Sequence, residues 1–484
     1  MTIAIPSART RRITIGAAVL GVVAALVLYD RLMRERPAPA VESDEEHFLH
    51  GSIGAEALEG VPYWIWLVLP RIVPDLLPGP GGYSSLGLLF RPGDELPVGI
   101  SKVTAGYPRV AVNCAFCHTA SVRTAPDARP AIVPGAPAHQ TAVQQYRRFL
   151  VAAAADPRFN AATILGEIAR NYRLSLVDRL LYRLWVIPDT RARLLRLGRQ
   201  SGWMDARPDW GPGRADVLSA VKFHRLGQAP DMTIGGADSM PLWGTAARAS
   251  RGLFWDGLHT SLQDAVVTSA LSAGASRPWL DRDLARWDRT DAGSLSSLRR
   301  IQNYLTVLKP PAYPFAIDRA LAAAGEPVYQ AECARCHAAA GGDVSGDTGT
   351  DARRRAVWTA AASAAYDTFA FGRVWKASGF TAAGSYVPVP LDGLWLRAPY
   401  LHNGSVPSLA DLLEGPTARP ARFWRGYDLY DPTRVGFVSA GSEAERLGTL
   451  YDTTLPGNAN TGHTYGHELP ADSKRALLEY LKTL

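Results

Sequence analysis

The sequence predicts a mainly α-helical chain that folds into two domains with long loops, preceded by one N-terminal transmembrane helix. Three observations support this class: an apolar run near the amino terminus, two copies of one cysteine motif far apart, and helical patterning between them. The 484 residues suffice for two cores, and 47% hydrophobic with 20% charged residues is the balance of a folded protein. The 44 glycines and 35 prolines are scattered, which favours a loop-rich fold.

Segment 1–36 is predicted to anchor the chain in a membrane. Residues 13–28 (ITIGAAVLGVVAALVL) are almost wholly apolar. A helix that rises about 1.5 Å per residue nearly crosses a hydrocarbon core of about 30 Å over such a run. Three arginines at positions 9–12 precede it, so the amino terminus should stay cytoplasmic and the rest should face the periplasm of a bacterium. The alternative is a signal peptide cleaved at a poor A-x-A-like site near 37–40, which would release a soluble periplasmic or secreted chain.

Two C-x-x-C-H motifs use every cysteine of the chain. They are Cys114-Ala115-Phe116-Cys117-His118 and Cys333-Ala334-Arg335-Cys336-His337. Two thiols three positions apart can add to the two vinyl groups of haem, and the next residue then presents its imidazole to the iron. A disulfide, a redox dithiol or a four-cysteine zinc site are the alternatives, but none of them requires a histidine after the second cysteine twice. The sequence therefore predicts two covalently bound haem c groups, with His118 and His337 as iron ligands.

The separation of the two motifs predicts one domain for each haem. The sequence Lys-Pro-Pro at 309–311 marks the boundary, because proline interrupts helical patterning there. The N-terminal haem domain is then 45–309 and the C-terminal haem domain is 310–484. Helical patterning within the first of them is clearest over 142–155 and 175–197.

The second axial ligand of the C-terminal haem is restricted by elimination. Met240 is the last methionine, so no methionine within the C-terminal domain can bind this iron. The histidines that follow His337 are His402, His463 and His467. Ligation by two histidines would lower the reduction potential and suit an electron relay. An open or tyrosine-ligated iron is the alternative, because a lone histidine is often a surface residue.

The second ligand of the N-terminal haem is not singled out by spacing. The downstream candidates are His139, Met204, His224, Met232, Met240 and His259. A five-coordinate iron is equally compatible with the sequence, and peroxide or dioxygen chemistry needs such an open position.

Two segments resemble the bacterial dihaem cytochrome c peroxidase superfamily, which includes the methylamine-utilisation dihaem enzymes. They are 253–257 (LFWDG) and 397–409 (RAPYLHNGSVPSL). In that superfamily the tryptophan of F-W-D-G sits between the haems and helps to carry electrons, which implies this role for Trp255; from the residue alone, a buried core aromatic is the alternative. The peroxidase pattern is broken after His402, where no methionine follows. Ser239 stands where peroxidases place an asparagine that helps to bind calcium, so the sequence does not decide whether this chain binds calcium.

Four further segments resemble the rubber oxygenase branch, whose members are exported dihaem dioxygenases. They are 60–66 (GVPYWIW), 82–88 (GYSSLGL), 96–102 (LPVGISK) and 455–466 (LPGNANTGHTYG). The resemblance implies that His463 is the distal ligand of the C-terminal haem and that His118 is the proximal ligand of a dioxygen site with an open distal face. The distal aromatic of that branch does not transfer, because Ala270 stands at its position, and the chain is shorter than the known rubber-cleaving enzymes.

The resemblance implies an oxidoreductase that activates dioxygen or hydrogen peroxide at the N-terminal haem, with His118 and Trp255 as catalytic residues and the C-terminal haem as electron relay. The alternative is a non-catalytic electron-transfer cytochrome in which both irons are six-coordinate. The predicted partners are a small periplasmic electron donor or acceptor, the membrane through the N-terminal helix, and peroxide, dioxygen or an apolar unsaturated substrate. Residues 61–73 (VPYWIWLVLPRIV) suggest an apolar channel or, alternatively, a core element. A net charge of +7 without charged blocks gives nucleic-acid binding no support.

Overall fold

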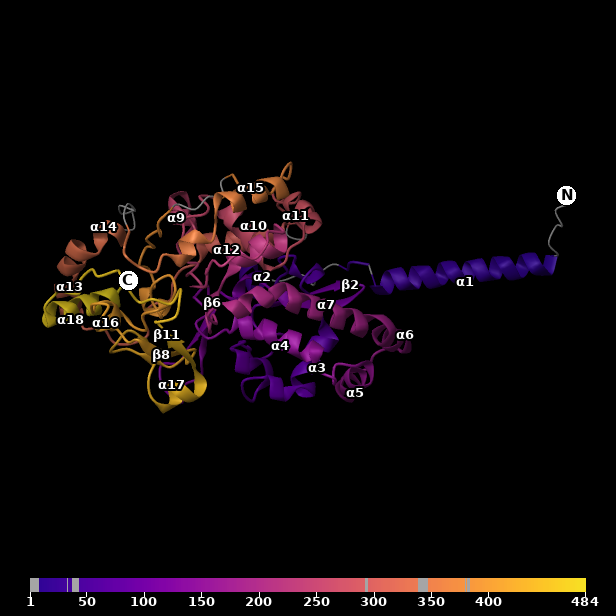
Figure 1. Ribbon diagram of the computed structural model, residues 1–484, viewed down its shortest axis with the longest axis horizontal. Coiled ribbons are helices and arrows are strands. Elements are labelled where there is room, and N and C mark those ends of the chain that lie inside the picture. Colours follow the sequence, from indigo (N-terminus) through magenta and orange to yellow (C-terminus); the bar gives the residue numbers. More distant parts are fainter. Residues whose placement is uncertain are drawn as a thin grey trace.

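The computed structural model describes residues 8–32, 34–36, 43–291, 295–337, 347–378, 380 and 384–484. Figure 1 shows a long helix, α1 (Ala8–Leu32), extending from one end of a folded body, with α13 and α18 at the opposite end. Helices outweigh strands in the described part of the chain, and many short loops join them.

The helices before Pro310 are short and mostly capped. They are α2 (Asp44–His50), α3 (Tyr63–Ile72), α4 (Val143–Ala155), α5 (Ala161–Asn171), α6 (Leu176–Leu181), α7 (Ile187–Ser201), α8 (Val217–Ala220), α9 (Thr245–Arg248), α10 (Leu262–Ala273), α11 (Arg277–Leu284) and α12 (Ser297–Val307). The helix expected over 142–155 is α4. The region 175–197 divides into α6, a π-helical turn η5 (Tyr182–Val186) and α7.

The later helices are α13 (Arg319–Glu332), α14 (Ala334–His337), α15 (Ala360–Phe369), α16 (Leu409–Leu412), α17 (Ser442–Leu447) and α18 (Ala471–Leu481). The strands form small antiparallel sheets. Strands β1 (Val61–Pro62), β3 (Tyr107–Val112) and β2 (Ile100–Ala105) lie in that order in one sheet, and four two-stranded sheets pair β4 (Thr119–Val122) with β5 (Ala131–Pro134), β6 (Arg214–Ala215) with β7 (Ala237–Asp238), β8 (Arg422–Arg425) with β11 (Thr449–Asp452), and β9 (Tyr430–Asp431) with β10 (Gly436–Phe437).

Helices α10 and α12 form the framework beside the first motif. Ser261 caps α10 by accepting a hydrogen bond from the amide of Asp264, which satisfies one of the free donors of the first turn. The buried carboxylate of Asp283 accepts bonds from the hydroxyl of Ser296 at 2.6 Å and from the amide of Ser297 at 2.8 Å, so it fixes the start of α12. These contacts fix the residues at which the two helices begin.

Apolar packing crosses the expected domain boundary. Val357, Trp358 and Tyr366 lie in the same buried cluster as α10 and α12, although they follow Pro310 in the chain. The division into 45–309 and 310–484 stays a prediction. The apolar segment 61–73 forms β1 and α3, whose Ile65 and Val68 are wholly buried in a second cluster, so its side chains serve the core.

The predicted N-terminal transmembrane helix is wrong. Within the described ranges, no helix combines the length and apolarity that a membrane crossing requires. The segment does form α1, but charged side chains occupy its last turns, and Nη1 of Arg31 lies 2.9 Å from the carboxylate of Asp178 in α6. This end of α1 is thus held against the folded body by an ion pair. The alternative cleavage site near 37–40 lies outside the described residues.

Candidate haem sites

The first motif begins on a short 3-10 turn, Cys114–Phe116, that Asn113 fixes from both sides. The Asn113 side chain accepts a hydrogen bond from the amide of Ala115 and donates one to the carbonyl of Gly51, both at 3.0 Å. Gly99 passes so close to this turn that a Cβ there would lie 2.3 Å from Cα of Phe116. The position therefore requires glycine.

His118 is oriented as a metal ligand. Its Nδ1 donates a hydrogen bond to the carbonyl of Met240 at 2.8 Å, which leaves the lone pair of Nε2 free. Burial lowers the pKa of His118 to about 4, against the opposing effect of this hydrogen bond, so the imidazole is neutral at physiological pH. A neutral imidazole with one nitrogen held and the other free is the form that binds iron.

The cavity beside His118 has a volume of about 250 Å³ and a mainly apolar wall. Small side chains of α10, including Ala265, Ser269 and Ala273, leave room on one side, while Ile301 and Leu305 of α12 close another. Ala270 points into the core of the protein and is fully buried. No aromatic residue of α10 lines the cavity in the described part of the chain, as the sequence expects from Ala270 and its neighbours.

Of the three methionines predicted as possible second ligands of the first iron, two lie at the cavity and one does not. Met204 and Met240 line the cavity. Met232 is 76% exposed.

The three histidines predicted as alternatives do not line this cavity. His224 is held by Trp203 and by the carbonyl of Gln200, and His259 contacts Thr268. His139 stacks on Phe437, with ring centroids 3.6 Å apart, and is hydrogen-bonded to the carbonyl of Ser121. Each of these imidazole rings therefore contacts other residues of the protein and lies outside the wall of the first cavity.

Burial of His139 predicts a loss of stability in mild acid. Burial lowers the pKa of His139 to about 4 from a usual value of 6.5. Between these two pH values the unfolded chain binds a proton that the folded chain refuses, so the free energy of unfolding decreases as the pH falls, by about 1.4 kcal/mol per pH unit from this group. We expect His139→Gln, which keeps a hydrogen-bond donor, to reduce this slope in urea titrations at pH 4–6.5. An unchanged slope would contradict the assignment.

The second motif opens on a larger cavity of about 590 Å³, lined by Cys333, Cys336 and His337. Nδ1 of His337 donates a hydrogen bond to the carbonyl of Val389 at 2.9 Å, as His118 does to Met240. Burial also lowers the pKa of His337. The two motifs therefore present their imidazoles in the same way, neutral and with Nε2 free.

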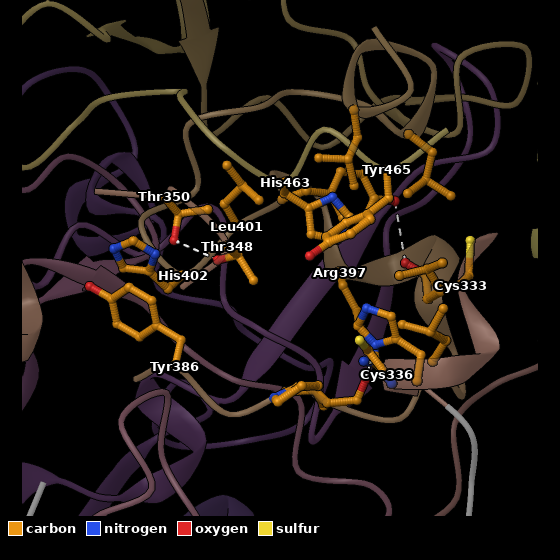
Figure 2. Close-up of a pocket in the computed structure, with 18 of the residues that line it drawn as sticks. Cys333, Cys336, Thr348, Thr350, Tyr386, Arg397, Leu401, His402, His463 and Tyr465 are labelled. Carbon is orange, nitrogen blue, oxygen red and sulfur yellow. Dashed lines mark hydrogen bonds between the residues drawn. The ribbon is translucent and has the colours of Figure 1, made fainter. Parts of the chain in front are cut away.

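His463 faces His337 across this cavity. Their ring centroids lie 6.2 Å apart, with an interplanar angle of 50°. Two imidazoles bound to one metal at about 2 Å have centroids roughly 6 Å apart, so His337 and His463 are the residues that would hold one iron here. Figure 2 shows His463 in the upper part of the view, with Cys336 below it and Cys333 to the right.

The loop that carries His463 is fixed through its main chain. Gly462 has a φ of 69° and His463 a φ of 46°, both in the left-handed region. The Arg419 guanidinium donates hydrogen bonds to the carbonyls of Gly462 at 2.8 Å and His463 at 2.9 Å, and the amide of His463 donates to the carbonyl of Thr348. The ring is free of these contacts, and burial lowers the pKa of His463 to about 4.

The two competing histidines have other surroundings. His402 lines the same cavity but stacks on Tyr386, with centroids 4.0 Å apart, and Figure 2 shows this pair away from Cys336. His467 is a surface residue that contacts the carbonyl of Thr464 and lies 3.8 Å from Glu468. Of the three candidates, the structure therefore brings His463 to the second motif.

Trp255 lines both cavities, together with Asp238 and Ser239. Its indole Nε1 donates to the carbonyl of Asp238 at 2.8 Å, and its carbonyl accepts from the amide of Val387 at 2.9 Å. Trp255, Asp238 and Ser239 thus form a wall that the two cavities share, and these hydrogen bonds hold Trp255 in it. Ser239, the candidate calcium position, belongs to this shared wall, and calcium binding stays a prediction.

Two arginines, one buried and one half-buried, were missed by the sequence reasoning. Arg248 lines the first cavity and Arg397 the second. Nε and Nη1 of Arg248 and Nε of Arg397 have no hydrogen-bond partner among the described residues. Burial lowers the pKa of Arg248 to about 10 and that of Arg397 to about 9, the latter helped by the charge of Arg248. Buried guanidinium groups without an anion are costly, so these two fit the propionate groups of haem.

Arg397 does stand in the quoted segment 397–409, but nothing in the sequence distinguishes its side chain from a surface arginine. Arg248 lies on α9 without any motif around it. Both are recognised only from their burial beside the cavities. The donors present for each cavity, two thiols, a neutral imidazole and a guanidinium with at least one nitrogen that has no partner among the described residues, fit haem c at both.

Comparison with known proteins supports this interpretation. Residues 384–425 match the family model described as RoxA-like, cytochrome c-like. The chain is 35% identical over 232 residues to uncharacterized protein y4iM of Sinorhizobium fredii, which covers 38% of this chain and 53% of that protein. It is 40% identical over 118 residues to uncharacterized protein y4iJ of the same organism, which covers 22% of this chain and 19% of that protein. The chain thus spans about half the length of the first relative and about a fifth of the second.

The matched residues 384–425 include the whole of 397–409 and, with them, Arg397 and His402. A cytochrome c-like segment implies covalently bound haem c. The chain therefore carries a RoxA-like, cytochrome c-like segment, which supports its assignment to the RoxA-like dihaem cytochromes and suggests a haem oxidoreductase.

Proposed function

We propose that this chain is an exported dihaem oxidoreductase of the rubber oxygenase type, which activates dioxygen or hydrogen peroxide at the N-terminal haem and uses the C-terminal haem as an electron relay. The observation that carries the proposal is the difference between the two cavities. The second holds two facing imidazoles, those of His337 and His463, whereas His118 is the single histidine among the described residues that line the first. An iron whose six coordination positions are all occupied suits electron transfer, whereas an iron with an open position suits reaction with an oxidant.

The residues around the first cavity would have the following roles. When bound beside His118, haem c supplies the iron chemistry that peroxide or dioxygen activation needs. Met240 holds the ring of His118 through its carbonyl, Arg248 would hold a propionate of the haem, and the small and apolar side chains of α10 and α12 would exclude water. The mainly apolar wall favours an apolar unsaturated substrate or a small oxidant over a charged one.

The spectrum of the oxidised protein tests this proposal. We expect one low-spin haem with two histidine ligands and one haem that binds cyanide or reacts with peroxide. Oxidative cleavage of an apolar unsaturated compound such as polyisoprene, with dioxygen uptake, would identify an oxygenase, whereas peroxide consumption with a reduced small cytochrome would identify a peroxidase. Two low-spin haems that bind no added ligand would overturn the proposal.

A non-catalytic electron carrier is the second candidate, and one observation favours it. Met204 and Met240 both line the first cavity, so a thioether that could bind iron lies in the wall of the cavity that would hold the first haem. In that case both irons would be six-coordinate. The oxidised spectrum would then carry the absorption band of a histidine–methionine haem, which the enzyme proposal does not allow.

Replacing Trp255 is expected to slow electron exchange between the haems. Trp255→Phe removes the indole from the wall that both cavities share, and we expect the rate of electron transfer between the haems to fall at least tenfold while haem content stays the same. Stopped-flow reduction by a small donor measures this rate. Trp243→Phe is the matched control, because Trp243 is 2% exposed and lines neither cavity. Equal rates in the two variants would remove Trp255 from the pathway.

Replacing Arg397 is expected to lower the midpoint potential of the C-terminal haem. The oxidised iron carries one more positive charge than the reduced iron, so removing a buried cation stabilises the oxidised form. For Arg397→Gln we expect a decrease of roughly 60 mV, about 1.4 kcal/mol for one electron. Potentiometric titration measures it. Arg397→Lys keeps the charge and should retain most of the potential; an equal decrease in both variants would point to packing instead.

A further inference from the structure

We propose that an exposed apolar face on α6 and η5 docks this protein on a membrane surface that contains anionic phospholipid. The face, here called the 176–185 face, consists of Leu176, Val177, Leu180, Leu184 and Trp185. The exposed fractions of these side chains run from 47% for Val177 to 83% for Leu176. Soluble proteins rarely leave so many large apolar side chains in water on one short segment, and such a patch marks an interaction site.

The 176–185 face is presented outward by a segment that is firmly held. Leu176, Leu180 and Leu184 follow one another at intervals of four residues, which places them on one side of a helix. Tyr182 and Val186 point the other way and are 3% and 1% exposed. The ring of Tyr182 packs edge-on against that of Tyr107, with centroids 6.1 Å apart. The apolar side chains are therefore exposed on a fixed helix.

Basic residues around the face select its partner. Arg173, Arg179 and Arg183 are exposed beside the apolar side chains. The acidic residue within α6, Asp178, is paired with Arg31 at 2.9 Å and does not cancel these charges. Leucine and tryptophan beside arginines are the composition of a helix that lies in the interface of a bilayer, where the apolar side chains enter the acyl region and the arginines meet lipid phosphates.

The surroundings of the face favour a membrane over a second copy of the chain. The Arg31–Asp178 pair joins α6 to the end of α1, whose Val22, Leu26 and Tyr29 are also 59% to 62% exposed. Figure 1 shows α1 and α6 at the same end of the body, so exposed apolar side chains collect there. A symmetric dimer through this face would bring arginines of one copy against the same arginines of the other, which is unfavourable.

A fluorescent probe on the face tests the proposal in the full chain. Leu180→Cys, labelled with an environment-sensitive dye, is mixed with vesicles of phosphatidylcholine alone or with added phosphatidylglycerol. We expect a blue shift of the emission and affinity at least tenfold higher for the anionic vesicles. The matched control is Phe371→Cys, because Phe371 is 81% exposed and follows α15, which lies apart from α6 in Figure 1. The unmodified chain treated with the same dye corrects for labelling of the motif cysteines.

Two sets of substitutions separate the apolar and the charged contributions. The combined variant Leu176→Ser, Leu180→Ser, Leu184→Ser and Trp185→Ser should have at least tenfold lower vesicle affinity, measured by co-sedimentation. Arg173→Gln, Arg179→Gln and Arg183→Gln together should remove the preference for anionic vesicles. Because all these side chains are exposed, folding should persist, and unchanged haem spectra check this. The proposal is overturned if the dye at position 180 stays in a water-like environment while the chain sediments with vesicles, or if its emission shifts with protein concentration alone, which would indicate a second copy.

Discussion

Replacing His463 by alanine is expected to convert the C-terminal haem from a low-spin to a high-spin form. If the rings of His337 and His463, 6.2 Å apart, bind one iron from opposite sides, removal of one leaves five ligands and an open position. The midpoint potential should rise, because the loss of a second imidazole destabilises the oxidised iron. Electron paramagnetic resonance and the visible spectrum measure the spin state, and added imidazole should restore the low-spin form.

The chain provides matched controls for this experiment. His467→Ala removes a half-buried histidine four residues away and should leave the spectrum as it is. His402→Phe removes the other cavity histidine and keeps a ring to stack on Tyr386. A high-spin haem in the His402 variant, with a low-spin haem in the His463 variant, would exchange the roles assigned to these two residues.

The sequence specifies the haem-binding chemistry better than it specifies the ligand sphere. The cysteines and histidines of the two motifs are recognisable because their chemistry is local, within five consecutive residues. The choice among His402, His463 and His467 depends on a loop whose path is set by Gly462, by the bonds that Arg419 donates and by the amide contact with Thr348. Such long-range contacts cannot be predicted from the residues next to a histidine in the sequence. Only the family resemblance indicated His463.

The fold, too, was predictable where a local pattern decides it and not where distant contacts decide it. The pattern over 142–155 predicted α4 within one residue at its start, because its buried face repeats at helical spacing. The apolar run 13–28 did form a helix, yet the transmembrane interpretation failed, because no helix in the described ranges is long and apolar enough to cross a membrane. The run itself also gives no sign that Arg31, which follows it, pairs with Asp178. The unpartnered guanidinium nitrogens of Arg248 and Arg397 could not be predicted either, because distant segments of the chain decide which arginine side chains are covered.

Removing the two thiols of the first motif is expected to have the largest effect on activity and to separate the roles of the two haems. In Cys114→Ala/Cys117→Ala no thioether can form at the first cavity, so the mass of the purified chain should be lower by one haem. The low-spin signal of the haem between His337 and His463 should persist, whereas cyanide binding and turnover of peroxide or dioxygen should be lost. Denaturing mass spectrometry, haem staining and oxygen uptake measure these three properties.

The corresponding variant of the second motif, Cys333→Ala/Cys336→Ala, should show the opposite pattern. It should also lose one haem in mass, lose the low-spin signal of two histidines, and keep a first haem that binds cyanide. Because Trp255 lines both cavities, this variant should react with an oxidant once and then fail to be reduced again by an external donor. If instead the first double variant retained turnover and the second lost it, the open iron would belong to the C-terminal cavity, and the roles of the two haems would be reversed.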